Sequence, residues 1–230
     1  MKKNTLLLQT LTIATIAGSS LAGVTGFESM TEGFAGESFT DGGITFSALN
    51  DVAGVNPDGS NFVAGEYGRQ FIVENATLAI NDFPGVLGGT NALSFGHNYI
   101  AGDNLSINIL SSFHMSTGQV ESFASMDLLI FENGPWSGIT LSLDATLNGM
   151  LVASDSYMLS DRGGRDNLVG QSLSIDGVAF DSLQLSARYN DGTYTAFAGL
   201  VDNIVIIPTP AHWAFSRQAP SSECAGVGRV

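Results

Sequence analysis

The side chains that could do chemistry in this sequence are carboxylates, because the usual nucleophiles and soft metal ligands are scarce. The 230 residues include 22 Asp and Glu but only three His and one Cys, Cys224. There is no Gly-x-Ser-x-Gly motif, and His97 and His114 are expected to be surface or hydrogen-bonded histidines rather than catalytic bases. The sequence therefore supports neither nucleophilic catalysis nor a zinc site.

Carboxylates alone allow two kinds of site. A glycosidase needs only two acids at a suitable separation, and with so many acids the sequence cannot select a pair. Calcium binds several carboxylate and carbonyl oxygens and tolerates irregular loops. Residues 161–167 mix acids with two arginines and lack the ligand spacing of an EF-hand loop. We therefore interpret them as a solvated loop with local ion pairs.

Aromatic side chains near turns are the candidates for sugar binding, since the apolar face of a pyranose stacks on an aromatic ring. Trp136 lies between turn residues in Asn-Gly-Pro-Trp-Ser-Gly, where a tryptophan is hard to bury. Tyr99 and Tyr194 are weaker candidates. A loop tryptophan can instead fold back over the edge of the core, and that alternative stays open.

The elements that must position these residues are short β-strands. Apolar and polar residues alternate in short runs from residue 44 onward, whereas no window of a dozen residues keeps a helical apolar stripe free of glycine and β-branched residues. We expect an all-β jelly-roll sandwich of about ten antiparallel strands, with little helix apart from the signal peptide. The expected strands are residues 44–49, 71–80, 92–95, 105–109, 120–131, 139–143, 150–159, 178–180, 183–187 and 194–207.

Turn residues agree with this architecture. Asn148-Gly149 and Asp191-Gly192 are dipeptides that readily adopt the positive φ angles of a type I′ hairpin turn. No linker rich in Pro, Ser or charge precedes Pro208, so we expect one domain over residues 23–207. Because Cys224 is the single cysteine, that domain is expected to have no internal disulfide.

The amino end has the features of a targeting segment. Lys2 and Lys3 precede an apolar stretch at residues 6–17, and Ser-Leu-Ala at residues 20–22 provides small residues for cleavage. We therefore expect a signal peptide at residues 1–22 and an exported protein that is extracellular or at the cell surface. The net charge of -14 repels phosphate backbones, so nucleic acid is not an expected partner.

Both ends of the expected domain resemble bacterial exported proteins of the PEP-CTERM type. The matching segments are residues 27–30, 39–47, 180–183, 199–206 (Gly-Leu-Val-Asp-Asn-Ile-Val-Ile) and the Pro-Thr-Pro at 208–210. The resemblance implies a galactose-binding-like jelly roll. Because terminal strands of jelly rolls often lie side by side, Glu28 and Asp202 are expected to meet, and related carbohydrate-binding modules hold a structural calcium near such a pair. The alternative is that Asp202 only hydrogen-bonds turn backbone.

The tail, residues 208–230, departs from that family, whose members end in an apolar segment capped by arginines. Residues 211–217 are neither apolar nor basic. Read one base earlier, however, the possible codons permit an apolar run, then arginines and a stop. We hypothesise a frameshifted sorting anchor, against a genuine polar tail, and the nucleotide sequence decides between them. Processing by an exosortase-like enzyme is expected only if the shifted frame is the true C-terminus.

These features predict an exported, non-catalytic β-sandwich that binds extracellular polysaccharide or acts as a matrix component. Structural Ca2+ is the one cofactor expected. Two alternatives stay open, a glycan-active enzyme of the glycosidase kind and a purely structural or adhesive surface protein without a small ligand. Oligomeric state is not indicated by the sequence.

Overall fold

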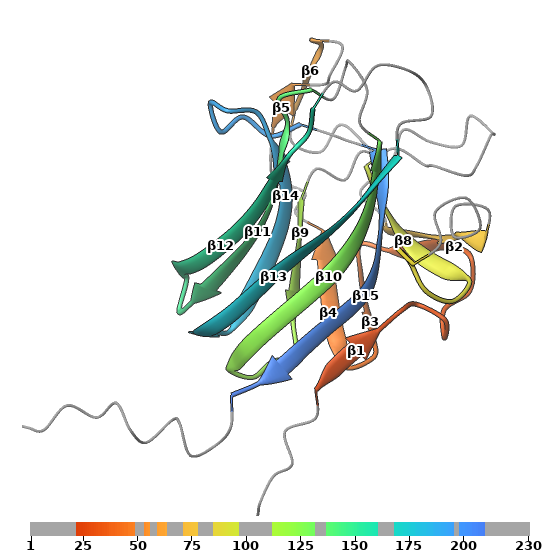
Figure 1. The fold of residues 1–230 in the computed structure, drawn as a ribbon, viewed down its shortest axis with the longest axis vertical. Helices are drawn as coiled ribbons and strands as arrows, with labels where there is room; N and C mark the ends of the chain where they lie inside the picture. The colour runs from red at the N-terminus through yellow and green to blue at the C-terminus, as the bar shows by residue number, and fades with distance from the viewer. Residues whose placement is uncertain are drawn as a thin grey trace, which may run out of the picture.

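The computed structural model describes residues 22–48, 53–55, 59–63, 71–77, 85–96, 112–131, 137–160, 168–195 and 198–209. In these residues the chain forms two antiparallel β-sheets that face each other, so the expected β-sandwich is confirmed (Figure 1). None of the described residues belong to a helix of the length and apolarity needed to cross a membrane. The signal peptide, the tail beyond Thr209, the strand expected at 105–109 and the loop at 161–167 lie outside the described residues.

One sheet has seven strands. Its order is β13 (Leu168–Phe180), β10 (Glu121–Phe131), β15 (Ala198–Pro208), β8 (Asn91–Gly96), β7 (Phe71–Asn75) and β2 (Gly33–Gly36), and β1 (Gly23–Thr25) also pairs with β15. The other sheet has six strands in the order β12 (Met150–Met158), β11 (Thr140–Leu147), β14 (Ser182–Arg188), β9 (Ser112–Ser116), β4 (Ile44–Ala48) and β3 (Ser38–Asp41). The short strands β5 (Gly54–Val55) and β6 (Asn61–Phe62) pair with each other.

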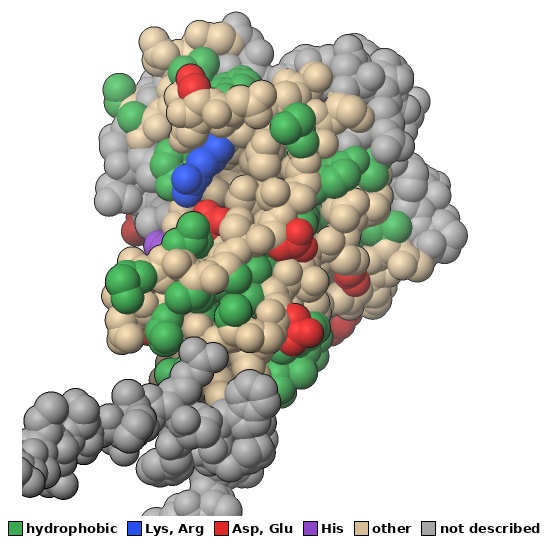
Figure 2. All heavy atoms as spheres, turned by 60° about the vertical axis from the view of Figure 1, so that its left-hand side comes forward, with side chains coloured by type: hydrophobic (Ala, Val, Ile, Leu, Met, Phe, Trp, Pro, Cys, Tyr) green, Lys and Arg blue, Asp and Glu red, His purple; other side chains and the backbone are tan. Residues whose placement is uncertain are grey.

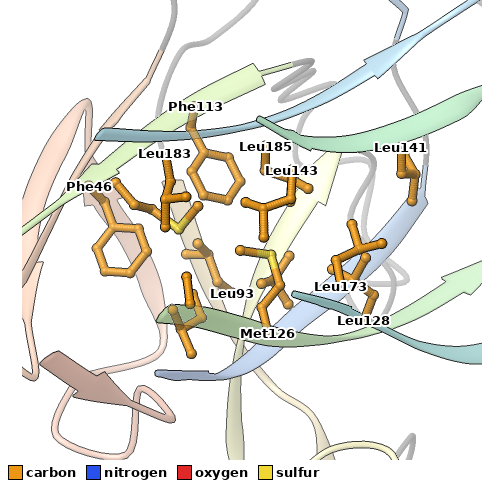
Figure 3. Close-up of a cluster of buried hydrophobic side chains, with 14 of the residues drawn as sticks. Phe46, Leu93, Phe113, Met126, Leu128, Leu141, Leu143, Leu173, Leu183 and Leu185 are labelled. Carbon is orange, nitrogen blue, oxygen red and sulfur yellow. The ribbon is translucent and has the colours of Figure 1, made fainter. Parts of the chain in front are cut away.

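The core lies between the two sheets and follows from the alternation in the sequence. In β11 every second side chain from Leu141 to Ala145 is buried, while the side chains between them are only partly buried. Leucines dominate the middle of the core, with Met126 among them (Figure 3). One end is aromatic, where the rings of Phe39 and Phe46 stack with their centroids 4.7 Å apart. Three further phenylalanines pack edge-on or tilted around this pair: Phe27, Phe71 and Phe113.

The first and last strands lie side by side, as expected from the jelly-roll pattern. Strand β1 pairs with the second half of β15, from Gly23 opposite Ile206 to Thr25 opposite Ile204. Strand β8 pairs with the first half of β15, from Ala198 to Val201. Two short strands therefore share one side of β15, and Asp202 and Asn203 fall in the gap between them.

The structure confirms one local expectation and corrects two. Asn148 and Gly149 both have positive φ, 52° and 76°, as a type I′ turn requires. In the other hairpin turn only Gly192 has positive φ, so Asp191 does not adopt the type I′ geometry expected of it. The strand expected at 178–180 is the end of the longer β13, whose alternation is broken in the sequence by Gly170 and Gly177.

Candidate functional site

The side chain of Asp202 is placed by the gap between β8 and β1. Asp202 pairs with Asp127 of the neighbouring strand β10, so both carboxylates lie on the same face of the sheet. That face is the outer one, because Val201 and Ile204 belong to the central core. The described turn at residues 85–90 covers Asp202, whose side chain has an exposed fraction of 0%.

A bulge and two unusual backbone conformations accompany this gap. The pairing of β10 with β15 shifts register between Ser125 and Asp127, which leaves Asn203 as an extra residue in β15. Asn203 has φ 48° and Phe27, in the turn after β1, has φ 59°. A positive φ is costly for a residue as bulky as Phe, and such conformations concentrate at sites that hold ligands. Both lie next to the predicted pair, Glu28 and Asp202.

The two predicted carboxylates each accept backbone hydrogen bonds. Asp202 Oδ2 accepts from the Gly88 amide at 2.8 Å. Glu28 Oε1 accepts from the amides of Thr90 at 2.6 Å and Asn91 at 2.9 Å. One turn, residues 88–91, is thereby fastened to both ends of the domain. Asp202 Oδ1, in contrast, is buried and has no hydrogen-bond partner among the described residues.

Glycines let the turn approach these side chains. A Cβ atom on Gly88 would lie 2.9 Å from Asn203 Oδ1, and one on Gly89 would overlap the carboxylate of Glu28. Gly89 also has φ +62°, which other residues rarely adopt. Neither glycine leaves room for a side chain.

The surroundings of Asp202 disfavour the ionised form of its carboxyl group. Burial and, to a smaller extent, the negative charges of Glu28 and Asp127 raise the pKa of Asp202 to about 6, against the lowering effect of hydrogen bonds from the backbone amides of Gly88 and Asn203. Of the described residues, Arg188 is the only lysine or arginine, and it lies in the other sheet. The described protein therefore supplies no cation to Asp202.

The donor set fits a hard cation that takes oxygen ligands. No three Asp, Glu, His or Cys side chains within the described segments group closely enough to hold a metal by themselves. Ca2+ does not need such a group, since it accepts backbone carbonyls and amide oxygens beside one or two carboxylates. Asp202 Oδ1, Glu28 and the Asn203 amide oxygen are the side-chain ligands available here.

The third acid in this region is Asp127, which the sequence does not single out and whose two carboxylate oxygens both accept hydrogen bonds. Its Oδ1 accepts from the Ser172 hydroxyl at 2.6 Å and its Oδ2 from the Asn203 amide at 3.0 Å. Asp127 also lines an open hollow of about 380 Å³, together with Gly85, Val86, Gly170, Gln171 and Ser172.

Another buried carboxylate lies at the start of β10. Glu121 is 2% exposed, and burial raises its pKa to about 7. Its Oε1 accepts from the Thr117 hydroxyl, while its Oε2 is buried without a partner. Nothing in the sequence pattern distinguishes this glutamate from the exposed ones.

Of the three aromatic residues predicted to stack on sugar rings, only Tyr194 lies among the described residues. Trp136 and Tyr99 lie outside the described residues. Tyr194 lies beside the six-stranded sheet, where its hydroxyl accepts from Arg188 at 2.9 Å and from Gln184 at 3.2 Å. The Arg188 guanidinium sits 4.5 Å from the centre of the Tyr194 ring and covers one ring face.

A row of polar side chains continues from Tyr194 across the outer face of the six-stranded sheet. Arg188 lies 3.9 Å from Asp144, which also accepts from the Ser154 hydroxyl at 2.6 Å. On the other side Gln184 donates to Ser112 at 2.8 Å. Figure 2 shows the arginine on this surface among polar atoms and isolated carboxylates.

Comparison with known proteins finds likeness in fold. No protein-family model matches the chain, and no curated protein does. The K2 cleaved adhesin domain of Lys-gingipain is 14% identical with a TM-score of 0.46, over 83% of this chain and 99% of that one. The CBM22-1 xylan-binding domain of Paenibacillus barcinonensis Xyn10C is 13% identical with a TM-score of 0.31, over 83% and 95%. TmCBM61, solved with β-1,4-galactotriose, is 11% identical with a TM-score of 0.31, over 60% and 82%.

Proposed function

We propose that this protein is an exported, non-catalytic module that binds extracellular polysaccharide on the outer face of its six-stranded sheet. The observation that carries the proposal is the polar row formed by Gln184, Tyr194, Arg188 and Asp144. A sugar chain offers many hydroxyls and an apolar ring face, and this row offers amide, guanidinium and carboxylate groups around an aromatic ring.

The arrangement of the row supports a ligand that lies along the surface. Arg188 covers one face of the Tyr194 ring, and we propose the other face as the stacking surface. Its position is fixed further by one hydrogen bond, which its backbone carbonyl accepts from the Val55 amide of β5 at 3.0 Å, and by an isolated β-bridge to Arg188. A ring held in place in the free protein loses little entropy on binding.

We further propose that the site at Glu28 and Asp202 holds a structural calcium ion. Support comes from the buried, unpaired Oδ1 of Asp202 and from its raised pKa in a region without a described cation. The ion would join the turn after β1, the turn at residues 88–91 and β15. It would stabilise the domain without touching the polysaccharide, because the polar row lies on the other sheet.

The burial of the acids favours binding over hydrolysis. Among the described residues, the carboxyl groups with pKa values raised to about 6 and about 7 are those of Asp202 and Glu121. Asp202 is 0% exposed and Glu121 is 2% exposed, so neither carboxyl group can reach a glycosidic bond at the surface.

Polysaccharide binding is tested on a glycan array with the full chain, in calcium and in EDTA. We expect binding to a defined set of glycans, at least a tenfold loss of affinity in Tyr194→Ala, and no loss in the control Tyr157→Phe. Absence of binding to any glycan would leave a structural or adhesive protein, and release of sugar from a polysaccharide would reveal an enzyme. The PEP-CTERM sorting of the chain stays a separate prediction, tested by the nucleotide sequence.

A further inference from the structure

Strand β12 forms one edge of the six-stranded sheet and has a second side available for pairing. It pairs with β11 along its length, from Met150 opposite Leu147 to Met158 opposite Thr140. No other described strand pairs with it, and it lies at the outside of the molecule (Figure 1). An edge of this kind presents unpaired backbone groups to any strand that approaches it.

The side chains of β12 are unusually apolar for an exposed edge. Met150, Leu151 and Met158 have exposed fractions of 68%, 63% and 56%, and Val152 follows at 37%. Figure 2, turned to bring this side forward, shows apolar side chains on it. Ser154 and Ser156, also exposed, lie between the two apolar ends of the strand.

Most of the devices that usually protect an edge strand are missing from this one. β12 contains no lysine, arginine or proline, and its single charged residue is Asp155. Asp155 Oδ2 accepts from the backbone amide of Ser174 at 2.8 Å, on β13 of the other sheet, and its Oδ1 accepts from the amide of Ser156 at 2.9 Å, on β12 itself. Pairing along β12 therefore requires the Asp155 side chain to release the Ser156 amide.

We propose that β12 pairs antiparallel with β12 of a second copy of this chain, about a two-fold axis at Ser154. The sequence of β12 is self-complementary in this register, because its apolar residues lie at both ends and its serines in the middle. Met158 of one copy would lie beside Met150 and Leu151 of the other, and Ser154 would face its own copy. The register shift in the β11–β12 ladder falls beside Val152, away from the centre.

Charge also permits this pairing in a chain that otherwise repels itself. The net charge of -14 opposes contact between two copies over most of their surface. In the proposed register the one charge on the strand, Asp155, faces Ala153 of the other copy, so no like charges meet across the axis. β12 is therefore a place where a second copy can approach without facing a carboxylate on the opposing strand.

Pairing in this way would join two six-stranded sheets into one continuous sheet. Residues opposite each other in antiparallel strands point to the same face, so the outer faces of both copies would lie on the same side. Pairing over nine residues belongs to the small class of interfaces, below about 1,200 Å² in total, and predicts a weak, reversible dimer. This inference does not rest on the proposed function.

The first test is sedimentation of the purified full chain over a range of concentrations. We expect a reversible dimer, and at least a tenfold weaker dimer in the double variant Met150→Lys with Met158→Lys, which sets lysines opposite each other twice. The matched control is Phe34→Lys with Val120→Lys, exposed apolar residues elsewhere, and it is expected to dimerise like the wild type. A wild type that stays monomeric, or a control that weakens the dimer equally, would overturn the proposal.

The second test fixes the register. Ser154→Cys, made together with Cys224→Ser, is expected to form a disulfide-linked dimer on oxidation, because Cα atoms opposite each other lie within bonding range. Ser156→Cys in the same background is the control, since its two copies would lie about 13 Å apart. Equal cross-linking at both positions, or none at Ser154, would contradict the two-fold axis.

Discussion

Two aspartates on opposite sheets show how differently this fold treats the same side chain. Asp144 lies on the outer face of the six-stranded sheet, 19% exposed, with Arg188 at 3.9 Å and the Ser154 hydroxyl at 2.6 Å. Asp202 lies under a turn on the seven-stranded sheet, fully buried, with one oxygen bonded to Gly88 and the other unpaired. The protein provides partners for the first charge and leaves the second incomplete.

The difference indicates that the two carboxylates have different roles. A charge on a polar, partly exposed face costs little to keep and adds little to stability. A buried carboxylate without a counter-charge costs several kcal/mol, and a protein retains it where something else compensates the cost. At Asp202 we propose that a bound cation provides this compensation.

The largest effect that we expect is the pH dependence of the free energy of unfolding in the absence of calcium. Asp202 and Glu121 have pKa values raised to about 6 and about 7, so the folded protein binds more protons than the unfolded chain above pH 4. Their contribution is therefore complete at low pH and is lost as pH rises through those values, by up to about 6 kcal/mol for both together. Chemical denaturation in EDTA from about pH 4 to pH 8 measures it, and stability that rises over this range would contradict the assignment.

Replacing Asp202 isolates its contribution to this pH dependence. Asp202→Asn keeps an acceptor for the Gly88 amide and removes the charge, so we expect it to raise ion-free stability by about 2–3 kcal/mol near neutral pH. Denaturation in EDTA gives the value. A destabilised variant would mean that the charge is already compensated within the protein.

Glu121→Gln is the matched control for that substitution. It also removes a buried carboxylate with a raised pKa, and we expect a gain of about 2 kcal/mol near neutral pH. Glu121 lies at the start of β10, six residues before Asp127, which pairs with Asp202. Its replacement should therefore leave any response to calcium unchanged. Loss of that response in Glu121→Gln would place the ion elsewhere.

The smallest effect is expected at Asp144. Asp144→Asn removes the attraction to a partly exposed Arg188 and should lower stability by less than about 1 kcal/mol, with no change in ion dependence. Thermal melting at low and high salt measures it. A loss as large as the gain in Asp202→Asn would remove the contrast between the two sheets.

The convergence of Glu28 and Asp202 could be predicted because it follows from strand order. Once the first and last strands are neighbours, residues just after one and within the other must lie close together. Asn203 and Asp127 could not be found in this way, because a bulge shifts the register by one residue and only packing decides where it falls.

The misjudged details have similar causes. The sequence Asp191-Gly192 predicts two positive φ angles, but in the folded turn the side chain of Asp191 accepts from the Thr193 amide at 2.9 Å and only Gly192 is left-handed. Glu121 looks like any other acid in the sequence. Its burial depends on the end of β15, which pairs beside it through Pro208.

The central claim is tested most directly by melting the full chain near neutral pH in EDTA and in millimolar calcium, beside Asp202→Asn. We expect calcium to raise the melting temperature of the wild type by several degrees, as a ligand at about 100 times its Kd adds about 2.7 kcal/mol. Asp202→Asn should not respond. An unchanged wild type, or an equal shift in the variant, would contradict a cation at Asp202.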